Sequence, residues 1–456
     1  MQDISRTPSL DVPFLTRWSP ARIMATGIIF YAVAIIVSPL QYDFDVISWG
    51  GVVYAVAAIA AFFMGCYIGQ TVNARGEPAT PQPFQVPLDR YVNITIVIAG
   101  LSIAARFYDR FVVRNFSVQE TYAETRESIE ASVSVWGYLG GPGFSLGLTA
   151  LALIWLSSSQ RRRPVVFVLA CLIAAYPMLE VMIQASRSTM LSTAFLVFFF
   201  ARATGALPWL VKSKLAMSIV ALGLVAVFQI IFEIRSLESG GYEESISEVY
   251  RLSAPAQFAA APTWLTNIIV ETDGWGLIAG ALKTWVHFEQ YLTHSWLVYF
   301  FNFDQFQDGV WGWGRFHLNM PLRLANLLVE AELTYSPYEH GMSEGLFSTV
   351  FSSIYYDFGA LGPLLAGLFG FMVTVLQKMT IRLPARWLSL YALLCYAIAM
   401  TLIDNLLIGG IGAFAIWGNL LYVGIHMLVS SLSRRSFLPA SPGLAPEDGP
   451  APGTAD

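Results

Sequence analysis

The sequence predicts an all-α polytopic membrane protein, and three observations point to this class. Apolar residues make up 55% of the chain and charged residues only 12%, whereas about 25% of a soluble domain is charged. Mostly apolar runs of about 18 or more residues recur along the chain, and each is long enough as a helix to cross a bilayer. Clusters of Lys and Arg lie in alternate connections between these runs, as the positive-inside rule requires of cytoplasmic segments.

Ten apolar runs are expected to be transmembrane helices. They lie at about 23–40, 46–72, 91–107, 135–157, 165–184, 189–206, 215–234, 347–376, 387–408 and 411–430. Both termini are then cytoplasmic, because the basic clusters between the runs all fall on one side. Arg17 and Arg22 mark the start, Arg161–Arg163 form the clearest internal signal, and Arg434 begins the last basic pair.

This topology divides the chain into five parts. Residues 1–20 form a cytoplasmic segment, 21–235 hold the first seven helices, and 347–432 hold the last three. Between the two groups lies a long external loop, 236–346. The tail 433–456 is rich in Pro, Ala and Gly and is expected to be disordered.

The long loop concentrates the residues that could bind a ligand. It holds four of the five histidines, six of the thirteen tryptophans, and thirteen acidic residues against four basic ones. Residues 285–303 are apolar but interrupted by His287, Glu289, Gln290 and His294. We expect a re-entrant or interfacial helix here, packed on protein because polar groups are costly in lipid. At least part of the loop should fold and bind something.

Four arginines are candidates for binding a phosphate group. Arg187 follows the fifth span and Arg235 follows the seventh, so both are expected at the external surface. Arg315 and Arg126 are further external candidates. A guanidinium binds phosphate oxygens through two parallel hydrogen bonds. The alternative is that these side chains only reach to the membrane interface or form structural ion pairs.

Four residues are candidates for acid–base chemistry. His340 and Glu344 lie in a turn-rich stretch before the eighth span, His294 lies in the interrupted segment, and Asp357 lies inside the eighth span beside two glycines and Pro363. Histidines and carboxylates are the usual proton-transfer groups of enzymes. The alternatives are solvated loop residues and, for Asp357, a hydrogen bond between helices. The spacing of the histidines matches no metal-binding pattern, so no metal site is predicted.

Two tryptophans are candidates for binding sugar. Trp311 and Trp313 are spaced by glycines in the run Trp311-Gly-Trp-Gly-Arg315. Flat amphipathic rings suit the apolar faces of sugars and leave the hydroxyl groups for polar partners. The alternative is an aromatic belt at the membrane interface.

Three stretches resemble the oligosaccharide repeat-unit polymerases of the Wzy type, which make O-antigen and capsule. Residues 344–364 are similar to the late motif of that family, an aromatic-Asp-Phe-Gly-x-x-Gly run that opens a helix after a long external loop. Ala185-Ser-Arg-Ser188 resembles its Ser-Arg-Gly element, with Ser188 where Gly is usual. Tyr291-Leu-Thr-His-Ser295 resembles its Tyr-Leu-x-Gly-x stretch, with His294 in place of Gly. The resemblance extends diffusely over roughly 90–430.

The resemblance implies a GT-C-like glycosyltransferase of the bacterial inner membrane. Such an enzyme joins glycans carried on undecaprenyl pyrophosphate at the periplasmic face, without a nucleotide sugar, cofactor or metal. Arg187 and Arg235 would stabilise the departing pyrophosphate, and His340 or a carboxylate would deprotonate the acceptor hydroxyl. Tyr291 and the tryptophans would position the glycan. The partners implied are the lipid-linked oligosaccharide, the bilayer and a chain-length regulator, with no nucleic acid.

Three other functions fit the same composition. An O-antigen ligase-like enzyme would use the same donor with a different acceptor. A polysaccharide flippase or exporter would need a polar path through the bundle, and many transporters show inverted repeats. We find no such repeat, and the polar residues gather in one loop. A scaffold of an envelope complex would not need cations at the external ends of two spans.

Overall fold

The computed structural model describes most of the chain, and all statements below concern these residues. They are 10–72, 88–114, 134–157, 164–184, 187–208, 213–238, 258–271, 277–306, 309–329, 332–340, 349–408 and 410–436. They are mostly helical, and their sheet consists of two short antiparallel strands, β1 (Gln41–Tyr42) and β2 (Ala259–Ala260). The predicted all-α class is confirmed. Arg126, Glu344, the N-terminal segment 1–9 and the tail 437–456 lie outside the described residues.

The described helices follow one another in chain order. They are α1 (Val12–Arg17), α2 (Pro20–Val37), η1 (Phe44–Val46), α3 (Trp49–Thr71), α4 (Leu88–Tyr108), η2 (Asp109–Val113), α6 (Val135–Gly140), α7 (Gly143–Leu156), α8 (Pro164–Gln184), α9 (Arg187–Thr204), α11 (Lys214–Glu238), α13 (Thr263–Glu271), α14 (Leu277–Gln305), α15 (Asn319–Val329), η5 (Pro337–His340), α16 (Val350–Phe358), η6 (Gly359–Leu361), α17 (Gly362–Arg382), α18 (Pro384–Met400) and α19 (Gly410–Ser436).

Helices long and apolar enough to cross a membrane occur six times in the described residues. They are Pro20–Val37, Trp49–Thr71, Leu88–Val113, Val135–Leu156, Val350–Arg382 and Gly412–Leu432. Four shorter apolar helices are Pro164–Leu179, Thr189–Thr204, Lys214–Val227 and Pro384–Met400. The six long helices indicate a multi-pass membrane protein, and all ten helices coincide with the apolar runs identified in the sequence.

Local sequence explains where the first long helices begin. The hydroxyl of Ser19 accepts a hydrogen bond from the backbone N–H of Arg22, and Pro20 occupies the first helical position of α2. Ser48 caps α3 in the same way by accepting from the N–H of Gly51 at 3.2 Å. Each cap satisfies one of the N–H groups that a helix start leaves without a partner.

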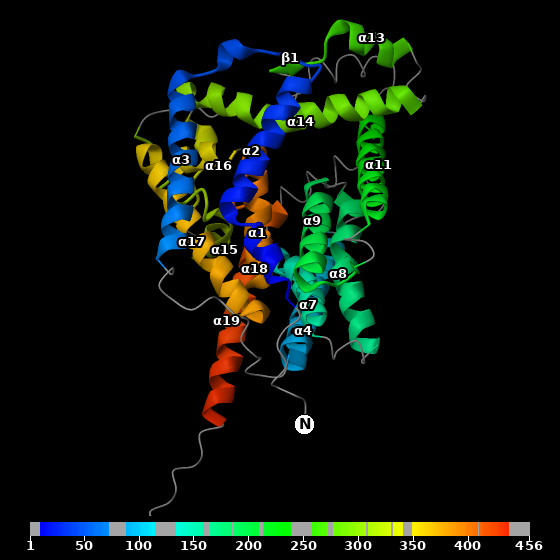
Figure 1. Cartoon of the computed structure of the whole chain (residues 1–456), viewed down its shortest axis with the longest axis vertical. Coiled ribbons are helices and arrows are strands. Elements are labelled where there is room, and N and C mark those ends of the chain that lie inside the picture. The colour runs from blue at the N-terminus through cyan, green and yellow to red at the C-terminus, as the bar shows by residue number, and fades with distance from the viewer. Residues whose placement is uncertain are drawn as a thin grey trace, which may run out of the picture.

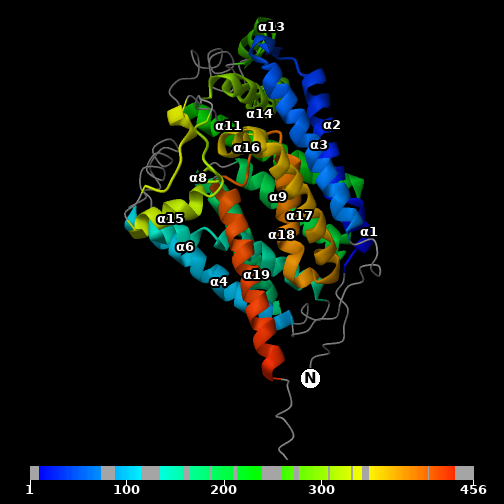
Figure 2. The ribbon, with the colours of Figure 1, turned by 90° about the vertical axis from the view of Figure 1, so that its left-hand side faces the viewer.

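Glycines bring α3 and α17 into backbone contact. These helices run side by side over much of their length (Figure 2). A Cβ atom at Gly65 would lie 1.8 Å from the carbonyl oxygen of Gly367, and one at Gly370 would lie 2.3 Å from that of Phe62. Association of apolar helices in a membrane depends on such close packing, because lipid offers no hydrophobic gain.

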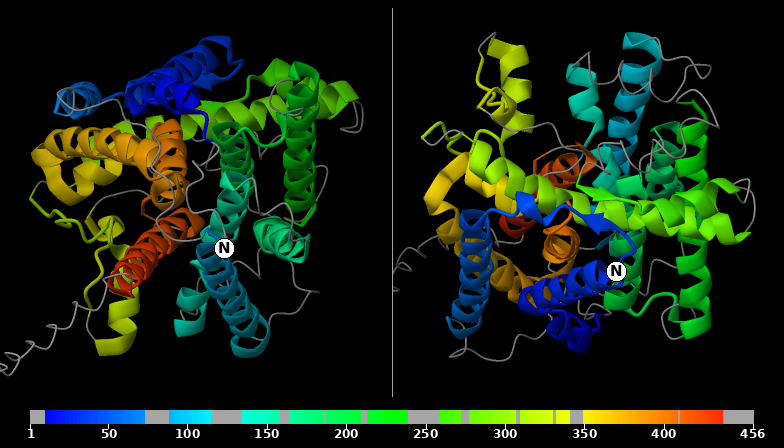
Figure 3. Two further views of the ribbon diagram at one scale, coloured as in Figure 1. Left: turned by 60° about the horizontal axis from the view of Figure 1, so that its bottom comes forward. Right: turned by 90° about the horizontal axis from the view of Figure 1, so that it is seen from above.

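Helix α14 lies across one end of the bundle, with α13 on its outer side (Figures 1 and 3). It covers the segment 285–303 and extends beyond it as one continuous helix. It is not among the apolar helices that could span a membrane. We refer to this end of the molecule as the α14 end; the C-terminal helix α19 ends at the opposite side (Figure 1).

Polar residues on α14 are buried in protein, which explains why this apolar segment is interrupted. His287, Glu289, Gln290 and His294 are all buried. The amide nitrogen of Gln290 donates to the carbonyl of Ala259 at 3.1 Å. On another face of the helix, the Tyr299 hydroxyl donates to the carbonyl of Gly51 at 2.8 Å. The helix is therefore fixed to both the outer layer and the bundle.

Replacing Gly65 with Ala should destabilise the bundle, because the added methyl group collides with the α17 backbone. We expect Gly65→Ala to lower the free energy of unfolding by about 1–3 kcal/mol, measured by thermal unfolding of the purified protein in detergent. Gly100→Ala is the matched control, since a Cβ at Gly100 in α4 meets no atom within 4 Å. An equal loss of stability in both variants would contradict this packing.

Candidate functional site

A tight turn carries residues 311–317 and is bonded to the end of α16. The backbone N–H of Gly312 donates to the carbonyl of Tyr356 at 3.0 Å, and that of Trp313 donates to the carbonyl of Asp357 at 2.8 Å. These bonds satisfy two of the carbonyls that a helix end leaves open. Trp313 and Gly314 have φ angles of 53° and 87°. A left-handed conformation is uncommon for an aromatic residue, and such residues gather at functional sites.

Two glycines allow the turn and the helix to interlock. A Cβ atom at Gly312 would lie 2.1 Å from Oδ1 of Asp357. A Cβ atom at Gly359, which has φ 52°, would lie 2.3 Å from the indole of Trp311. Gly359 also breaks the helix, so Asp357 lies at the end of α16 and not inside a continuous span. The Gly-rich turn and the Asp-Phe-Gly motif are therefore two halves of one structure.

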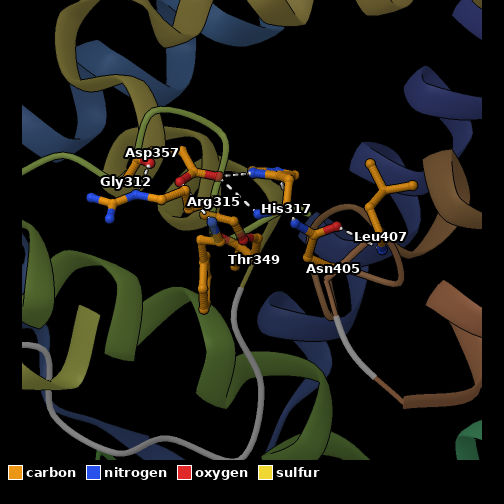
Figure 4. A network of polar contacts seen from close by, with 9 residues as sticks. Gly312, Arg315, His317, Thr349, Asp357, Asn405 and Leu407 are labelled. Atoms are coloured by element: carbon orange, nitrogen blue, oxygen red, sulfur yellow. Dashed lines mark hydrogen bonds and ion pairs between the residues drawn. The ribbon is translucent and has the colours of Figure 1, made fainter. Parts of the chain in front are cut away.

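The carboxylate of Asp357 is fully buried and accepts three hydrogen bonds from the turn (Figure 4). Oδ1 accepts from the backbone N–H of Phe316 at 3.0 Å. Oδ2 accepts from the backbone N–H of His317 at 2.9 Å and lies 2.6 Å from Nδ1 of the His317 ring. Hydrogen bonds to a carboxylate are about twice as strong as neutral ones, so this group holds the turn against α16.

The imidazole of His317 is fixed between two elements. With the Nδ1–H donating to Asp357, the lone pair of the ring is on Nε2, which lies 3.4 Å from Nδ2 of Asn405. Asn405 belongs to the connection between α18 and α19, and its Oδ1 accepts from the N–H of Leu407 at 3.0 Å (Figure 4). The His317 side chain is 18% exposed, whereas that of Asp357 is 0% exposed. A ligand can therefore reach the imidazole but not the carboxylate.

A cation and an aromatic ring border this pair. The guanidinium of Arg315 lies 5.4 Å from the centre of the Tyr335 ring, and its Nε donates to the carbonyl of Gly312 at 2.9 Å. The Tyr335 hydroxyl donates to the carbonyl of Val310 at 2.6 Å. Burial and the charge of Asp357 raise the pKa of Tyr335 to about 12, against the opposing effect of Arg315. Tyr335 thus remains neutral at physiological pH.

The site combines acid–base, cationic and aromatic groups. An imidazole held by a carboxylate can transfer a proton to or from a hydroxyl group. Arg315 is exposed and can contact an anion, and the Trp313 side chain is 62% exposed. These groups suit a ligand that carries hydroxyl groups, apolar ring faces and a negative charge. In the described part of the chain, no group of three His, Cys, Asp or Glu residues is arranged to hold a metal ion.

The structure brings together several of the residues predicted from the sequence. Asp357, Arg315, Trp311 and Trp313 lie in one site, and His340 stacks on Tyr335 at its edge with ring centres 5.4 Å apart. The sequence pattern placed His317 among four loop histidines but did not single it out. The signal that could have done so is its position two residues after Arg315, at the end of the Gly-rich turn.

His294 and Tyr291 lie on α14, outside this group of residues. The His294 side chain is 1% exposed, and neither ring nitrogen has a hydrogen-bond partner among the described residues. Burial lowers its pKa to about 4. A neutral imidazole without hydrogen bonds to the described residues is not part of the polar network around Asp357.

Arg187 and Arg235 are described only by their backbones. Arg187 begins α9 and Arg235 lies in the last turn of α11. The start of α9 and the end of α11 both face the α14 end of the bundle (Figure 1). The positions of the two guanidinium groups lie outside what the structure describes.

Comparison of the chain with protein-family models, with curated proteins and with solved structures finds no significant match in any of the three.

The interlocking of Trp311 and Gly359 predicts that Gly359→Ala destabilises the protein. The substitution adds both a left-handed strain and a collision with the indole, and we expect it to cost about 2–4 kcal/mol. Gly309→Ala is the matched control, because Gly309 has φ 87° but no atom within 4 Å of its Cβ position. Thermal unfolding with tryptophan fluorescence measures both. Equal effects would show that the contact with Trp311 does not matter.

The buried His294 predicts a loss of stability in acid. Between pH 6.5 and about 4, the unfolded chain binds a proton at His294 and the folded protein does not. Stability should therefore fall as the pH falls through this window, by up to about 2 kcal/mol at pH 5. The difference between the melting temperatures at pH 7 and pH 5 should be smaller in His294→Gln. An identical pH dependence in variant and wild type would refute the assignment.

Proposed function

We propose that this protein is a GT-C-like glycosyltransferase of the bacterial inner membrane. It polymerises oligosaccharide repeat units carried on undecaprenyl pyrophosphate into O-antigen, capsular polysaccharide or exopolysaccharide. In this proposal the ten apolar helices all span the membrane, both termini are cytoplasmic, and the α14 end faces the periplasm. The six long apolar helices and the agreement between the ten helices and the basic clusters support this topology.

The observation that carries the proposal is the interlocked pair formed by the Asp-Phe-Gly motif and the Gly-rich turn. The motif is the part of the sequence that most resembles the polymerases, and Asp357 within it is held by three hydrogen bonds from the turn. The turn adds the cation of Arg315 and the exposed indole of Trp313. The residues of the motif thus belong to a site whose groups suit a charged glycan.

The lipid-linked donor would approach this site from the surrounding bilayer. Arg187 and Arg235 would bind the pyrophosphate at the start of α9 and the end of α11, since both helix ends face the α14 end. Guanidinium groups at developing negative charge stabilise the transition state of such a transfer. Trp311 and Trp313 would contact the sugar rings, and a base of the loop would accept the proton of the acceptor hydroxyl.

Surface polysaccharide from cells lacking this protein tests the proposal. We expect the ladder of chain lengths on a gel to collapse to single repeat units and to return with the wild-type gene. Arg315→Ala should restore roughly 10- to 100-fold less polymer, because a charge-assisted contact of about 1.5–3 kcal/mol is lost. Arg187→Ala and Arg235→Ala test the pyrophosphate contacts in the same assay. Arg382→Ala, at the far end of α17, is the matched control and should restore the full ladder.

The other outcomes separate the alternatives. Lipid-linked repeat units trapped on the cytoplasmic face would indicate a flippase. Full-length polymer that is not transferred to lipid A-core would indicate a ligase-like enzyme. A ladder that does not change when the gene is removed would refute the proposal.

A further inference from the structure

We propose that His317 is the catalytic base of this site, and that Asp357 and Asn405 are the residues that position it. The inference rests on the proposed glycosyl transfer, and it assigns the proton-accepting atom, which the sequence alone left open among several histidines and carboxylates.

Asp357 itself is poorly placed to meet a substrate. Its side chain is fully buried, and both oxygens already accept hydrogen bonds from the turn. A carboxylate in this environment acts on the group that it touches. That group is the Nδ1–H of His317, at 2.6 Å. The pair has the geometry in which a buried carboxylate fixes the orientation and tautomer of a histidine and stabilises its protonated form.

His317 carries its lone pair on Nε2 when Nδ1–H donates to Asp357, and 18% of its side chain is exposed. Nε2 faces the Asn405 amide at 3.4 Å, a distance at the long limit for a hydrogen bond. Asn405 is buried, but a contact of this length is weak, so an acceptor hydroxyl that enters beside Asn405 would replace it at small cost. The Phe358 ring lies 6.1 Å from the imidazole, centre to centre, and packs to one side of it. The ring of His317 is thus held firmly at Nδ1, whereas Nε2 has only a long contact.

His340 lacks this arrangement in the described structure. Its described contact is the stack on Tyr335, and stacking fixes neither the tautomer nor the direction of a lone pair. His294 is enclosed in α14. Of the histidines in the described part of the loop, His317 is therefore the one that combines exposure with a carboxylate on its opposite nitrogen.

The step that follows is a simple displacement. The acceptor hydroxyl oxygen forms a bond to the anomeric carbon of the donor, and its proton passes to Nε2 of His317. The bond between the anomeric carbon and the phosphate oxygen breaks, and undecaprenyl pyrophosphate leaves with the electron pair. Asp357 stabilises the imidazolium until Nε2 returns the proton to water. The step as written balances without an oxidant, a metal or a nucleotide.

Other charged or titratable groups surround His317 and must be separated from it in a pH experiment. They are Asp357 on α16, Arg315 on the turn, Tyr335 on the following segment, and Asp404 next to Asn405 in the α18–α19 connection. Burial raises the pKa of Asp404 to about 7, so Asp404 titrates in the range expected for a histidine. The experiment therefore includes the variant Asp404→Asn. This variant should show the same fall in rate at low pH as the wild type.

The test uses the full-length protein in proteoliposomes with undecaprenyl-pyrophosphate-linked repeat units, and it measures the initial rate of chain extension from pH 5 to pH 9. In the wild type the rate should fall in acid as the base becomes protonated. His317→Ala should lose roughly 10²- to 10⁴-fold in rate. It should also lose the fall in rate at low pH (the acid limb of the pH–rate profile). Added imidazole should restore part of the rate. Asn405→Ala should shift the acid limb along the pH axis and should lose less rate than His317→Ala.

His317→Asn separates a loss of the base from a loss of folding. Its side-chain amide can donate to Asp357 in place of Nδ1–H, but it has no lone pair at the position of Nε2. It should melt close to the wild type and be as slow as His317→Ala. His340→Gln is the comparison at the edge of the site and should retain the acid limb. An active wild type with an unchanged rate and acid limb in His317→Asn would overturn the assignment and leave the glycosyl transfer intact. An inactive wild type would instead overturn the proposed function.

Discussion

A buried carboxylate requires hydrogen-bond donors, and the requirement of Asp357 organises the segments around it. Removing a charge from water costs several kcal/mol unless good partners replace the solvent. Here the partners are two consecutive backbone N–H groups and an imidazole, all from one turn. The turn can approach only because Gly312 has no side chain to meet the carboxylate. The positions of Arg315, Trp313 and His317 follow from this single contact.

The class of the protein and the places of its helices could be predicted from the sequence, because apolar runs report directly on burial in lipid. The Gly-rich turn and the candidate residue Asp357 could also be identified from the sequence, since glycine patterns and a carboxylate in an apolar run are local signals. The pairing of Asp357 with His317 was not. The two residues are 40 positions apart, and no local pattern distinguishes His317 from the other loop histidines. His340 was preferred because it lies close in sequence to the motif, whereas in the structure it contacts Tyr335.

Helix α14 shows how polar residues can interrupt an apolar segment without disrupting it. The sequence shows which polar residues interrupt the apolar segment but not which groups they contact. A re-entrant path and an interfacial helix are therefore both compatible with the pattern. The structure shows one continuous helix that lies across the end of the bundle. Its polar groups are enclosed by β2 and by the bundle, and Ser295 donates to the carbonyl of Ile403 in the connection that carries Asn405. The packing of α14 and the position of Asn405 are therefore linked.

The sequence separations within the site have a consequence for biogenesis. His317 and Asp357 are 40 residues apart, and His317 and Asn405 are 88 apart, so these contacts form only after most of the chain has been synthesised. Contacts between residues so far apart in sequence form slowly, because closing the loop lowers the entropy of the chain before the contact can stabilise it. A nascent chain inserted as far as α17 holds the imidazole and its carboxylate but not Asn405. The complete site thus arises only after α18 and the connection that follows it have been synthesised.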